Sequence, residues 1–190
     1  MEFRMTRIGA YLAQAALSTI LAVSASSAFA ALPVGAAAPD FRLDAALAGK
    51  PMSFSLTKAL QQGPVVLYFF PAAFTQGCTV EAHAFAEATD DFHKLKATVI
   101  GVTAGNADRV AEFSKLECRD KFAVAADPGA KVAAEYQTQF RTKDGKALSE
   151  RTSFVIAPDG KILLSYTDPN PELHIQKTMS AVKAWHEAKK

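Results

Sequence analysis

The sequence contains two cysteines, Cys78 and Cys118, and the surroundings of Cys78 are the first feature that could do chemistry. Cys78 lies in the stretch PAAFTQGCTVE, where a proline, a threonine, a glycine and a glutamate stand at fixed offsets around it. A cysteine in this position can fill space as a small apolar side chain, form half of a structural disulfide, or act as a reactive thiolate. These three alternatives predict different functions for the protein.

The position of Cys78 between a strand and a helix favours the reactive thiolate. Residues 64–70 form a continuous apolar run, PVVLYFF, typical of a strand buried on both faces, and the following proline breaks it. Apolar residues then recur at helical spacing from Thr79 to about Lys96, so Cys78 lies where that helix should begin. The first turn of a helix leaves backbone N–H groups free and carries the positive end of the dipole, which favours a thiolate. Gly77 allows close backbone approach and a positive φ, and the Thr75 hydroxyl can point at the same place.

Strands and helices alternate along much of the chain, and this order predicts the fold class. Strands are expected at 51–56 as a sheet edge, at 97–104 and at 122–127; helices are expected at 106–116 with Asn106 as the cap, and within 127–136 after a turn. A hairpin is expected over 151–168 around Pro158-Asp159-Gly160, then a helix from Pro171 whose face carries Leu173, Ile175, Met179, Val182 and Trp185. Residues 137–150 read as a loop. The order predicts an α/β fold with a central mixed sheet and helices on both sides.

The N-terminus has the pattern of a secretory signal peptide. Two arginines among the first seven residues precede an uncharged apolar stretch, and Ala28-Phe29-Ala30 gives the small residues expected before a cleavage site. We therefore predict a signal peptide over 1–30 and one exported domain, periplasmic or otherwise extracytoplasmic, over 31–190. The alternative is an uncut membrane anchor, because the stretch from Ile8 to Leu32 is long enough to span a bilayer.

The charge pattern and the missing motifs narrow the function classes. Lys and Arg number 21 against 19 Asp and Glu, without a basic block, so we expect no nucleic-acid partner. The four histidines, among them His83 and His174, lack the spacing of metal ligands, which predicts no metal site. Neither a G-x-G-x-x-G nor a P-loop pattern occurs, so no nucleotide cofactor is predicted.

A longer pattern around Cys78 resembles that of a known family. From Pro71 to Glu81 the residues follow P-x-x-x-T-x-x-C-x-x-E, which is similar to the active-site signature of the peroxiredoxins (the AhpC/TSA superfamily), thiol-dependent peroxidases of thioredoxin-like fold. The stretches VGAAAPDFRL, AADPGAKVAAEY and ERTSFVIAPDGKI resemble further family patterns in the right order, although Ala157 stands where an acidic residue is usual. The resemblance spans roughly Val34 to the last helix. It implies one thioredoxin-like domain with a central mixed β-sheet flanked by helices on both faces, and no cofactor.

The resemblance implies roles for three charged or ionisable residues. Cys78 would be the peroxidatic nucleophile, whose thiolate attacks a hydroperoxide and becomes a sulfenic acid. Arg151 would stabilise that thiolate and the negative charge on the departing oxygen. Glu81, one turn into the helix, would hold the guanidinium of Arg151 in position.

The resemblance also implies roles for three residues without charge. The Thr75 hydroxyl would orient the thiolate and the peroxide, and Pro71 would shape the pocket and keep bulk water away. The backbone N–H groups around Gly77 and Cys78 would complete an anion-binding turn. Taken singly, Pro71 could simply end a strand and Thr75 could be an ordinary loop residue.

The role of Cys118 stays open at the level of sequence. The stretch TQGCTVEAHAF most resembles the bacterioferritin-comigratory, or PrxQ, branch, in which many members place a resolving cysteine five residues after the peroxidatic one; here that position is His83. Other members place it in the helix expected here over 106–116, and Cys118 lies near or just beyond the end of that helix. Either Cys118 attacks the sulfenic acid of Cys78 to form an intramolecular disulfide, or Cys118 is a buried bystander and an external thiol acts instead.

The resemblance implies a hydroperoxide substrate and a thioredoxin-like or small-thiol reductant. It also suggests a monomer or a dimer, with no stable membrane association once the signal peptide is removed. Two other functions compete. A thioredoxin-like thiol–disulfide oxidoreductase needs a C-x-x-C pair, but Thr75 occupies the first of those positions. A redox-inert binding domain of the same fold predicts that Cys78 reacts with peroxide no faster than a free thiol.

Overall fold

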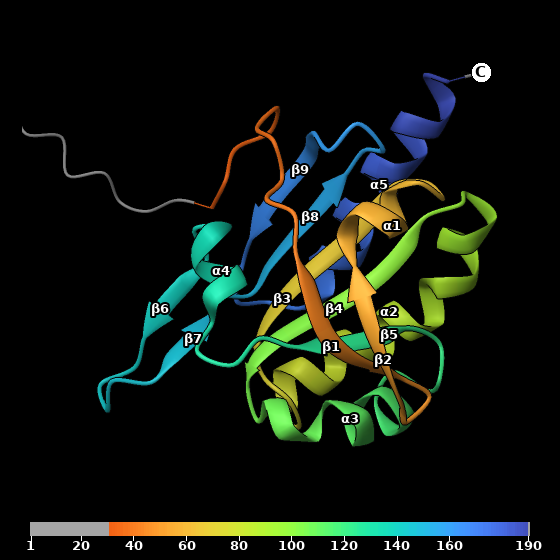
Figure 1. Ribbon diagram of the computed structural model, residues 1–190. Helices are drawn as coiled ribbons and strands as arrows, with labels where there is room; N and C mark the ends of the chain where they lie inside the picture. Colours follow the sequence, from red (N-terminus) through yellow and green to blue (C-terminus); the bar gives the residue numbers. More distant parts are fainter. Residues whose placement is uncertain (1–30, 190) are drawn as a thin grey trace, which may run out of the picture.

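The computed structural model describes residues 31–189 of the 190-residue chain, and the predicted signal peptide over 1–30 lies outside them (Figure 1). The strands of the main sheet are β1 Arg42–Leu47, β2 Lys50–Ser55, β3 Val65–Ala72, β4 Thr98–Gly105, β5 Ala123–Ala126, β8 Thr152–Ile156 and β9 Ile162–Thr167. They form one seven-stranded sheet in the order β2-β1-β5-β4-β3-β8-β9. Parallel pairs (β3 with β4, β4 with β5) and antiparallel pairs occur together, which confirms the expected mixed sheet.

Strand β3 lies inside the sheet because its residues are apolar on both faces. It pairs in parallel with β4 and antiparallel with β8, so neither of its edges is exposed to water. Tyr68 of β3 lies opposite Gly101 of β4, and a Cβ atom at Gly101 would stand 2.7 Å from the phenol oxygen. The glycine therefore leaves the room that the Tyr68 ring needs against the sheet.

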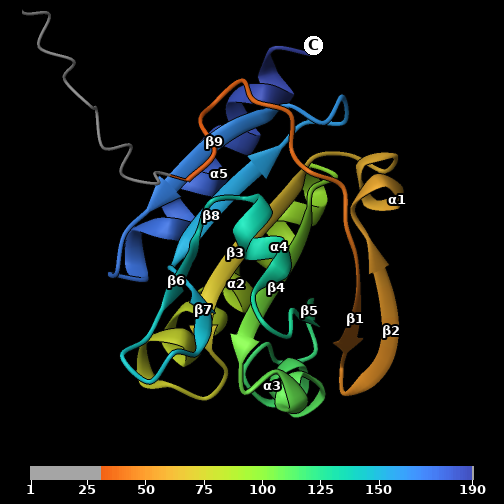
Figure 2. The ribbon, with the colours of Figure 1, turned by 60° about the vertical axis from the view of Figure 1, so that its left-hand side comes forward.

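The helices cover both faces of the sheet (Figures 1 and 2). They are α1 Leu56–Leu60, α2 Gln76–Lys94, the short 3-10 helix η1 Ala107–Arg109, α3 Val110–Leu116, α4 Lys131–Glu135 and α5 Glu172–Glu187. Side chains of α2, α3 and α5 pack with Val66, Tyr68 and Phe70 on one face, whereas α1 and α4 pack on the other. This arrangement confirms the predicted layers. Within residues 31–189, no helix is long and apolar enough to cross a membrane.

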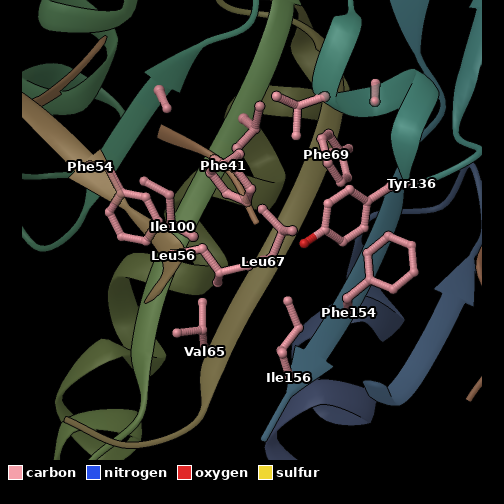
Figure 3. Close-up of a cluster of buried hydrophobic side chains, with 14 of the residues drawn as sticks. Phe41, Phe54, Leu56, Val65, Leu67, Phe69, Ile100, Tyr136, Phe154 and Ile156 are labelled. Atoms are coloured by element: carbon pink, nitrogen blue, oxygen red, sulfur yellow. The ribbon is translucent and has the colours of Figure 1, made fainter. Parts of the chain in front are cut away.

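The core under α1 and α4 is built from aromatic rings that join four separate parts of the chain (Figure 3). The ring of Tyr136 lies 5.3 Å from that of Phe69, 5.2 Å from that of Phe154 and 6.2 Å from that of Phe41. Its hydroxyl donates to the carbonyl of Pro39 at 2.8 Å. Burying rings of this size stabilises the fold by about 1.5–3 kcal/mol each, and this core holds β8 against β3.

Several local expectations are wrong or incomplete. Strand β1 was not expected, because a proline- and glycine-rich segment precedes it and charged residues interrupt it. The stretch 137–150 is a small hairpin of β6 Gln139–Arg141 and β7 Ala147–Ser149 rather than a loop. Asn106 stands at the N-cap position of η1, but its side chain makes no cap hydrogen bond: its backbone is left-handed, and its side chain donates to the carbonyl of Ala73 at 2.7 Å. Leu173 is exposed, and His174 takes the buried position on α5 instead.

Candidate active site

Cys78 lies in the first turn of α2, directly after the corner that joins this helix to β3. The helix begins at Gln76 with Thr75 as its N-cap residue, so it starts earlier than the apolar spacing from Thr79 predicts. The corner contains Phe74 in a left-handed conformation, with φ 62°, an unusual geometry for a residue that is not glycine. The Asn106 amide donates to the carbonyl of Ala73 and thereby fixes this corner to the end of β4. Cys78 is almost completely buried at the positive end of the helix dipole.

Arg151 reaches Cys78 from the other side of the corner. Phe69, near the end of β3, pairs with Thr152, the first residue of β8, so the residue before β8 comes close to the helix that follows β3. The Nη2 atom of Arg151 donates to the Sγ atom of Cys78 at 3.5 Å. Strand pairing thus places a cation next to a cysteine at a helix N-terminus.

Two other groups hold the guanidinium of Arg151 on the sides away from Cys78. Its Nη1 atom donates to Oε2 of Glu81, and its Nε atom donates to the carbonyl of Pro169 at 3.1 Å. Only 9% of the Arg151 side chain and none of the Glu81 side chain is exposed, so this ion pair is screened little by solvent. The structure therefore brings the predicted partners Glu81 and Arg151 together.

Burial controls the electrostatics of this pair. It raises the pKa of Glu81 to about 8, and the attraction and hydrogen bond of Arg151 offset only part of that effect. Burial alone would lower the pKa of Arg151, but the negative charges of Glu81 and Cys78 outweigh it and raise that pKa. Arg151 is consequently a permanent cation that faces two acidic groups.

Gly77 allows the close approach that the sequence indicated, although it does so without a positive φ. A Cβ atom at this position would stand 3.1 Å from the Nη2 atom of Arg151, closer than such contacts normally are. Any larger residue here would press on the guanidinium. The glycine thus matters for the distance between the helix backbone and Arg151.

Pro71 and Thr75 lie at the site but do not contact Cys78 in the same way as Arg151. Pro71 lines a surface pocket of about 280 Å³ together with Arg151, Asp168, Pro169 and two neighbouring residues, Glu150 and Thr167. The Thr75 hydroxyl donates to the carbonyl of Ala72 at 3.1 Å, so in this state its hydrogen is committed to the backbone. A small substrate could enter beside Arg151, where Pro71 forms part of the pocket wall.

Cys118 is a free, fully buried thiol just beyond the end of α3. It belongs to the same cluster of buried side chains as Cys78, on the face of the sheet covered by α2, α3 and α5. Burial raises the pKa of its thiol well above the usual range, and Glu117 adds to the effect. Burial of Tyr68 raises the pKa of its phenol, and the nearby Cys118, Glu81 and Cys78 raise that pKa further. Both cysteines thus lie near enough to Tyr68 to affect its ionisation.

Three side-chain contacts tie the segment around Cys118 to helix α2. The three pairs are His83 with Glu117 at 2.7 Å, Glu87 with Arg119 at 3.1 Å, and Asp90 with Lys121 at 2.9 Å. The α2 members follow one another at helical spacing, and their partners are every second residue of segment 117–121. Within this segment Arg119 and Asp120 both have left-handed backbones, with φ 50° and 60°. We call these contacts the α2 latch. It holds a strained segment that carries Cys118 against the helix that carries Cys78.

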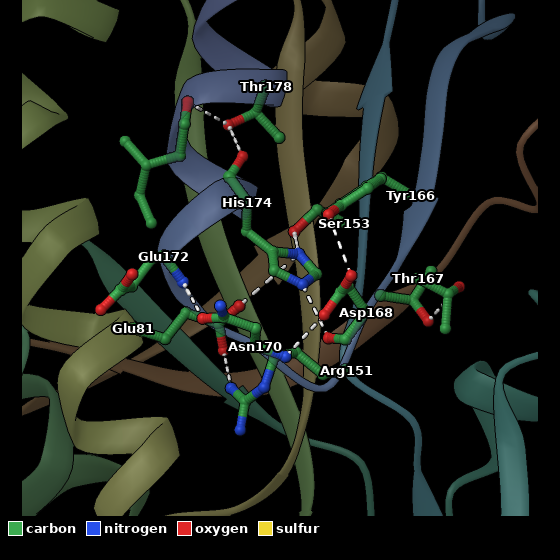
Figure 4. Close-up of polar contacts among 12 residues, drawn as sticks. Glu81, Arg151, Ser153, Tyr166, Thr167, Asp168, Asn170, Glu172, His174 and Thr178 are labelled. Carbon is green, nitrogen blue, oxygen red and sulfur yellow. Dashed lines mark hydrogen bonds and ion pairs between the residues drawn. The ribbon is translucent and has the colours of Figure 1, made fainter.

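One part of the site was missed by sequence reasoning. His174, Ser153 and the carbonyl of Asp168 form a buried polar group behind Glu81 and Arg151 (Figure 4). The sequence offered no signal for it, because His174 stands alone in a helical segment and one of its partners is a backbone atom. Among residues 31–189, no group of three or more His, Cys, Asp or Glu side chains could hold a metal ion.

The chain is similar in sequence to a known family of proteins. Residues 34–165 match the family model described as the AhpC/TSA family. The chain is 32% identical over 163 residues to the chloroplastic peroxiredoxin Q of Sedum lineare, covering 84% of this chain and 82% of that protein. It is 35% identical over 173 residues to the chloroplastic peroxiredoxin Q of Arabidopsis thaliana, covering 88% of this chain and 76% of that protein.

Solved structures show the same similarity. The peroxidoxin BcpB of Mycobacterium tuberculosis superposes with a TM-score of 0.72 at 29% identity, covering 80% of this chain and 97% of that one. A variant of the Xylella fastidiosa PrxQ gives a TM-score of 0.71 at 20% identity over 81% of this chain and 97% of that one. The second comparison bears on the fold alone, which it shares with this chain.

Proposed function

The chain belongs to the AhpC/TSA family and is a thiol-dependent peroxidase of the peroxiredoxin Q type, and from this premise we propose that Cys78 is its peroxidatic nucleophile. The observation that carries the proposal is the 3.5 Å contact between the Nη2 atom of Arg151 and the Sγ atom of Cys78 at the start of α2. A cation and a helix N-terminus at one sulfur favour the thiolate, which is the form that attacks peroxides.

The proposed reaction begins with attack of the Cys78 thiolate on one oxygen of a hydroperoxide. A sulfur–oxygen bond forms, the oxygen–oxygen bond breaks, and the departing oxygen leaves as water or an alcohol after taking up a proton. The sulfur is oxidised to a sulfenic acid and the peroxide is reduced. Arg151 stabilises the negative charge both on the thiolate and on the departing oxygen, while Glu81 and the Pro169 carbonyl keep its guanidinium from turning away.

Thr75 and Pro71 complete the proposed peroxide site. Thr75 stands on the loop that enters α2 and its hydroxyl oxygen keeps free lone pairs, so it can accept a hydrogen bond from a protonated peroxide. Pro71 forms part of the pocket beside Arg151. The backbone N–H groups around Gly77 and Cys78 add further positive potential at the sulfur.

We propose that Cys118 resolves the sulfenic acid. Its thiol would attack the Cys78 sulfur, forming a disulfide and releasing the hydroxyl as water, and a thioredoxin-like or small thiol would then reduce the disulfide. Both thiols are buried in one cluster on the same side of the sheet, which supports this pairing over an idle cysteine. Bond formation requires the first turn of α2 to unwind and segment 117–121 to leave the α2 latch.

We also propose that the protein acts outside the cytoplasm. The support is the sequence pattern of residues 1–30, with two early arginines, an uncharged apolar stretch and small residues at 28 and 30. An exported enzyme must draw electrons from an extracytoplasmic thiol source. N-terminal sequencing of the exported protein tests this directly: a chain that starts at Ala31 supports export with cleavage, whereas a chain that retains residues 1–27 contradicts it.

Peroxide consumption in the presence of a small dithiol tests the proposed roles of the two cysteines. The wild-type protein should turn over, and Cys78→Ser should not. After peroxide treatment without reductant, peptide mapping should show a Cys78–Cys118 disulfide. The resolving role fails if that disulfide peptide is missing and Cys118→Ser keeps full turnover with a protein reductant.

A further inference from the structure

A buried histidine lies directly behind the ion pair that holds Arg151. His174, near the start of α5, has no exposed surface (Figure 4). Its Nε2 atom lies 2.9 Å from the carbonyl oxygen of Asp168, and its Nδ1 atom lies 2.8 Å from the Ser153 hydroxyl. A carbonyl can only accept, so Nε2 carries a proton; burial lowers the pKa of His174 and favours the neutral ring, whose Nδ1 atom accepts from Ser153.

His174 lies next to Glu81 and hydrogen-bonds the residue before Pro169, and Glu81 and Pro169 are the groups that hold Arg151. The Nδ1 atom of His174 lies 3.8 Å from Oε1 of Glu81, an oxygen for which residues 31–189 supply no hydrogen-bond partner, while the other oxygen accepts from Arg151. Its Nε2–H holds the carbonyl of Asp168, and the carbonyl of the next residue, Pro169, accepts from Nε of Arg151. The imidazole of His174 is therefore linked to the guanidinium of Arg151 in two ways, through Glu81 and through the Asp168–Pro169 backbone.

Several hydrogen bonds hold the Asp168–Pro169 segment: the carboxylate of Asp168 accepts from the Tyr166 hydroxyl at 3.2 Å and from the Asn170 N–H at 2.7 Å. The segment follows the last residue of β9 and precedes α5, and the N–H of Asp168 also donates to the Arg151 carbonyl at 3.2 Å. The hydrogen bond from His174 is a further anchor of this segment, at the carbonyl that directly precedes Pro169, whose own carbonyl must stay within reach of Nε of Arg151. Figure 4 shows the His174 side chain of α5 beside Ser153 and Asp168.

We propose that His174 is a positioning residue for the peroxidase reaction, which it serves by anchoring Asp168–Pro169 and by lying against Glu81, so that Nη2 of Arg151 stays directed at Cys78. This inference rests on the proposed role of Arg151 at Cys78. An arginine has several rotatable bonds, and its charge assists a sulfur only from a defined place. Because small misplacements of such groups cost up to about a hundredfold in rate, a side chain that never touches the peroxide can still control its reduction.

The test measures the second-order rate of hydrogen peroxide with Cys78 in the full chain, in a Cys118→Ser background that isolates the first step. His174→Leu replaces the imidazole with an apolar side chain and removes both ring nitrogens. We expect the rate to fall about tenfold to hundredfold. His174→Gln keeps an N–H that can reach the Asp168 carbonyl, and it should recover most of that loss. The matched control is His93→Leu, an exposed histidine at the far end of α2, which should react at the wild-type rate.

A double-mutant cycle separates positioning from a general loss of structure. If His174 acts through Arg151, then His174→Leu should cost little in an Arg151→Lys background, where the fork it positions is gone. Circular dichroism checks that each variant is folded. Should His174→Leu not fold, Ser153→Ala provides the reading, because it removes the hydrogen bond at Nδ1 alone and should lower the rate by a smaller factor.

The outcomes distinguish this inference from the proposed function. A folded His174→Leu variant that reacts with peroxide at the wild-type rate overturns the positioning role. The positioning role is also overturned if His174→Leu lowers the peroxide rate by the same factor whether residue 151 is arginine or lysine, because the effect would then not depend on the guanidinium. If the wild-type protein itself reacts no faster than free cysteine, the proposed function fails instead, and the variants leave that result unchanged.

Discussion

The Nη2 atom of Arg151 lies 3.5 Å from the Sγ atom of Cys78, although 73 residues separate the two in the chain. The sheet creates this contact, because β8 pairs antiparallel with β3 and so brings the residue before β8 next to the helix after β3. The same arrangement places Glu81, one turn further into α2, on the opposite side of the guanidinium. The reactivity of the Cys78 sulfur should therefore depend on the planar shape and the position of the Arg151 guanidinium.

Arg151→Lys should slow the reaction of Cys78 with hydrogen peroxide by about a hundredfold. Lysine keeps the positive charge but cannot contact Glu81, Pro169 and Cys78 at once with three separate N–H groups in a fixed plane. Stopped-flow measurement of the single-turnover rate checks this. Arg141→Lys, an exposed arginine on β6, is the matched control and should leave the rate unchanged. An Arg151→Lys rate within twofold of wild type would show that charge alone is sufficient.

Gly77→Ala should separate stability from activity. Alanine favours the helix by up to about 1 kcal/mol, so the free energy of unfolding should rise or stay constant. The new Cβ would stand 3.1 Å from Nη2 of Arg151 and push the guanidinium aside, so the peroxide rate should fall several-fold. Gln76→Ala, an exposed position one residue earlier in the helix, should affect neither quantity much. An unchanged peroxide rate in Gly77→Ala would mean that the guanidinium yields without consequence.

Glu81→Gln should change how stability depends on pH. The folded pKa of Glu81 is raised from its ordinary value of about 4.5 to about 8, so between these values the folded protein binds more protons than the unfolded chain. The free energy of unfolding contributed by this group is fully present below about pH 4.5 and is lost as the pH rises through about 8. Urea unfolding across this range should show a downward slope in the wild type that is shallower in Glu81→Gln.

The control for this pH dependence is Glu187→Gln, an exposed carboxylate at the end of α5 that should keep the wild-type slope. Parallel curves for Glu81→Gln and the wild type would show that the buried carboxyl group of Glu81 does not release its proton in this window. The peroxide rate of Glu81→Gln should fall below the wild-type rate above about pH 8, where Glu81 is a carboxylate that holds Arg151 more strongly than a neutral amide does.

Weakening the α2 latch should speed formation of the Cys78–Cys118 disulfide. Each exposed pair contributes less than about 1 kcal/mol, so removing two of them with Glu87→Gln and Asp90→Asn should accelerate this step about two- to tenfold. The first step, oxidation of Cys78, should not change. Quenched samples analysed for the disulfide measure the rate after one equivalent of peroxide. Asp91→Asn is the control, because Asp91 pairs with Lys94 inside α2.

A slower or unchanged disulfide rate in the double variant would contradict the latch. Raising the salt concentration in the wild type should act in the same direction as the substitutions, because these contacts are exposed and therefore screened.

The sequence predicted those parts of the fold that rest on local pattern. Residues 64–70 are apolar without interruption, and such a run is required of a strand covered on both faces, so β3 was found within two residues. Arg151 and Glu81 were predicted as site residues because the spacing and order of several motifs matched a family. No local pattern could show that they would meet at Cys78; that follows from the pairing of β8 with β3.

The failures have equally specific causes. Val80 of α2 and Leu173 of α5 are exposed although both fit an apolar face, whereas Glu81 and His174, next to them in sequence, are buried. Polar residues at buried positions are invisible to a count of apolar spacing, because their burial depends on partners from other elements. Asn106 is a residue type common at helix N-caps, but its side chain donates a hydrogen bond to the carbonyl of Ala73 in the corner before α2. The site residues that the sequence pattern fails to predict are thus those whose side chains contact other site side chains and not the substrate.

The measurement that tests the role of Cys78 most directly is the second-order rate constant for hydrogen peroxide with the wild-type protein, with Cys78→Ser, and with free cysteine at the same pH. A thiolate held by Arg151 at the start of α2 should react more than about a thousandfold faster than free cysteine, and Cys78→Ser should lose this fast reaction entirely. A wild-type rate equal to that of free cysteine, or a fast reaction that persists in Cys78→Ser, would contradict the assignment of Cys78 as the peroxidatic thiol.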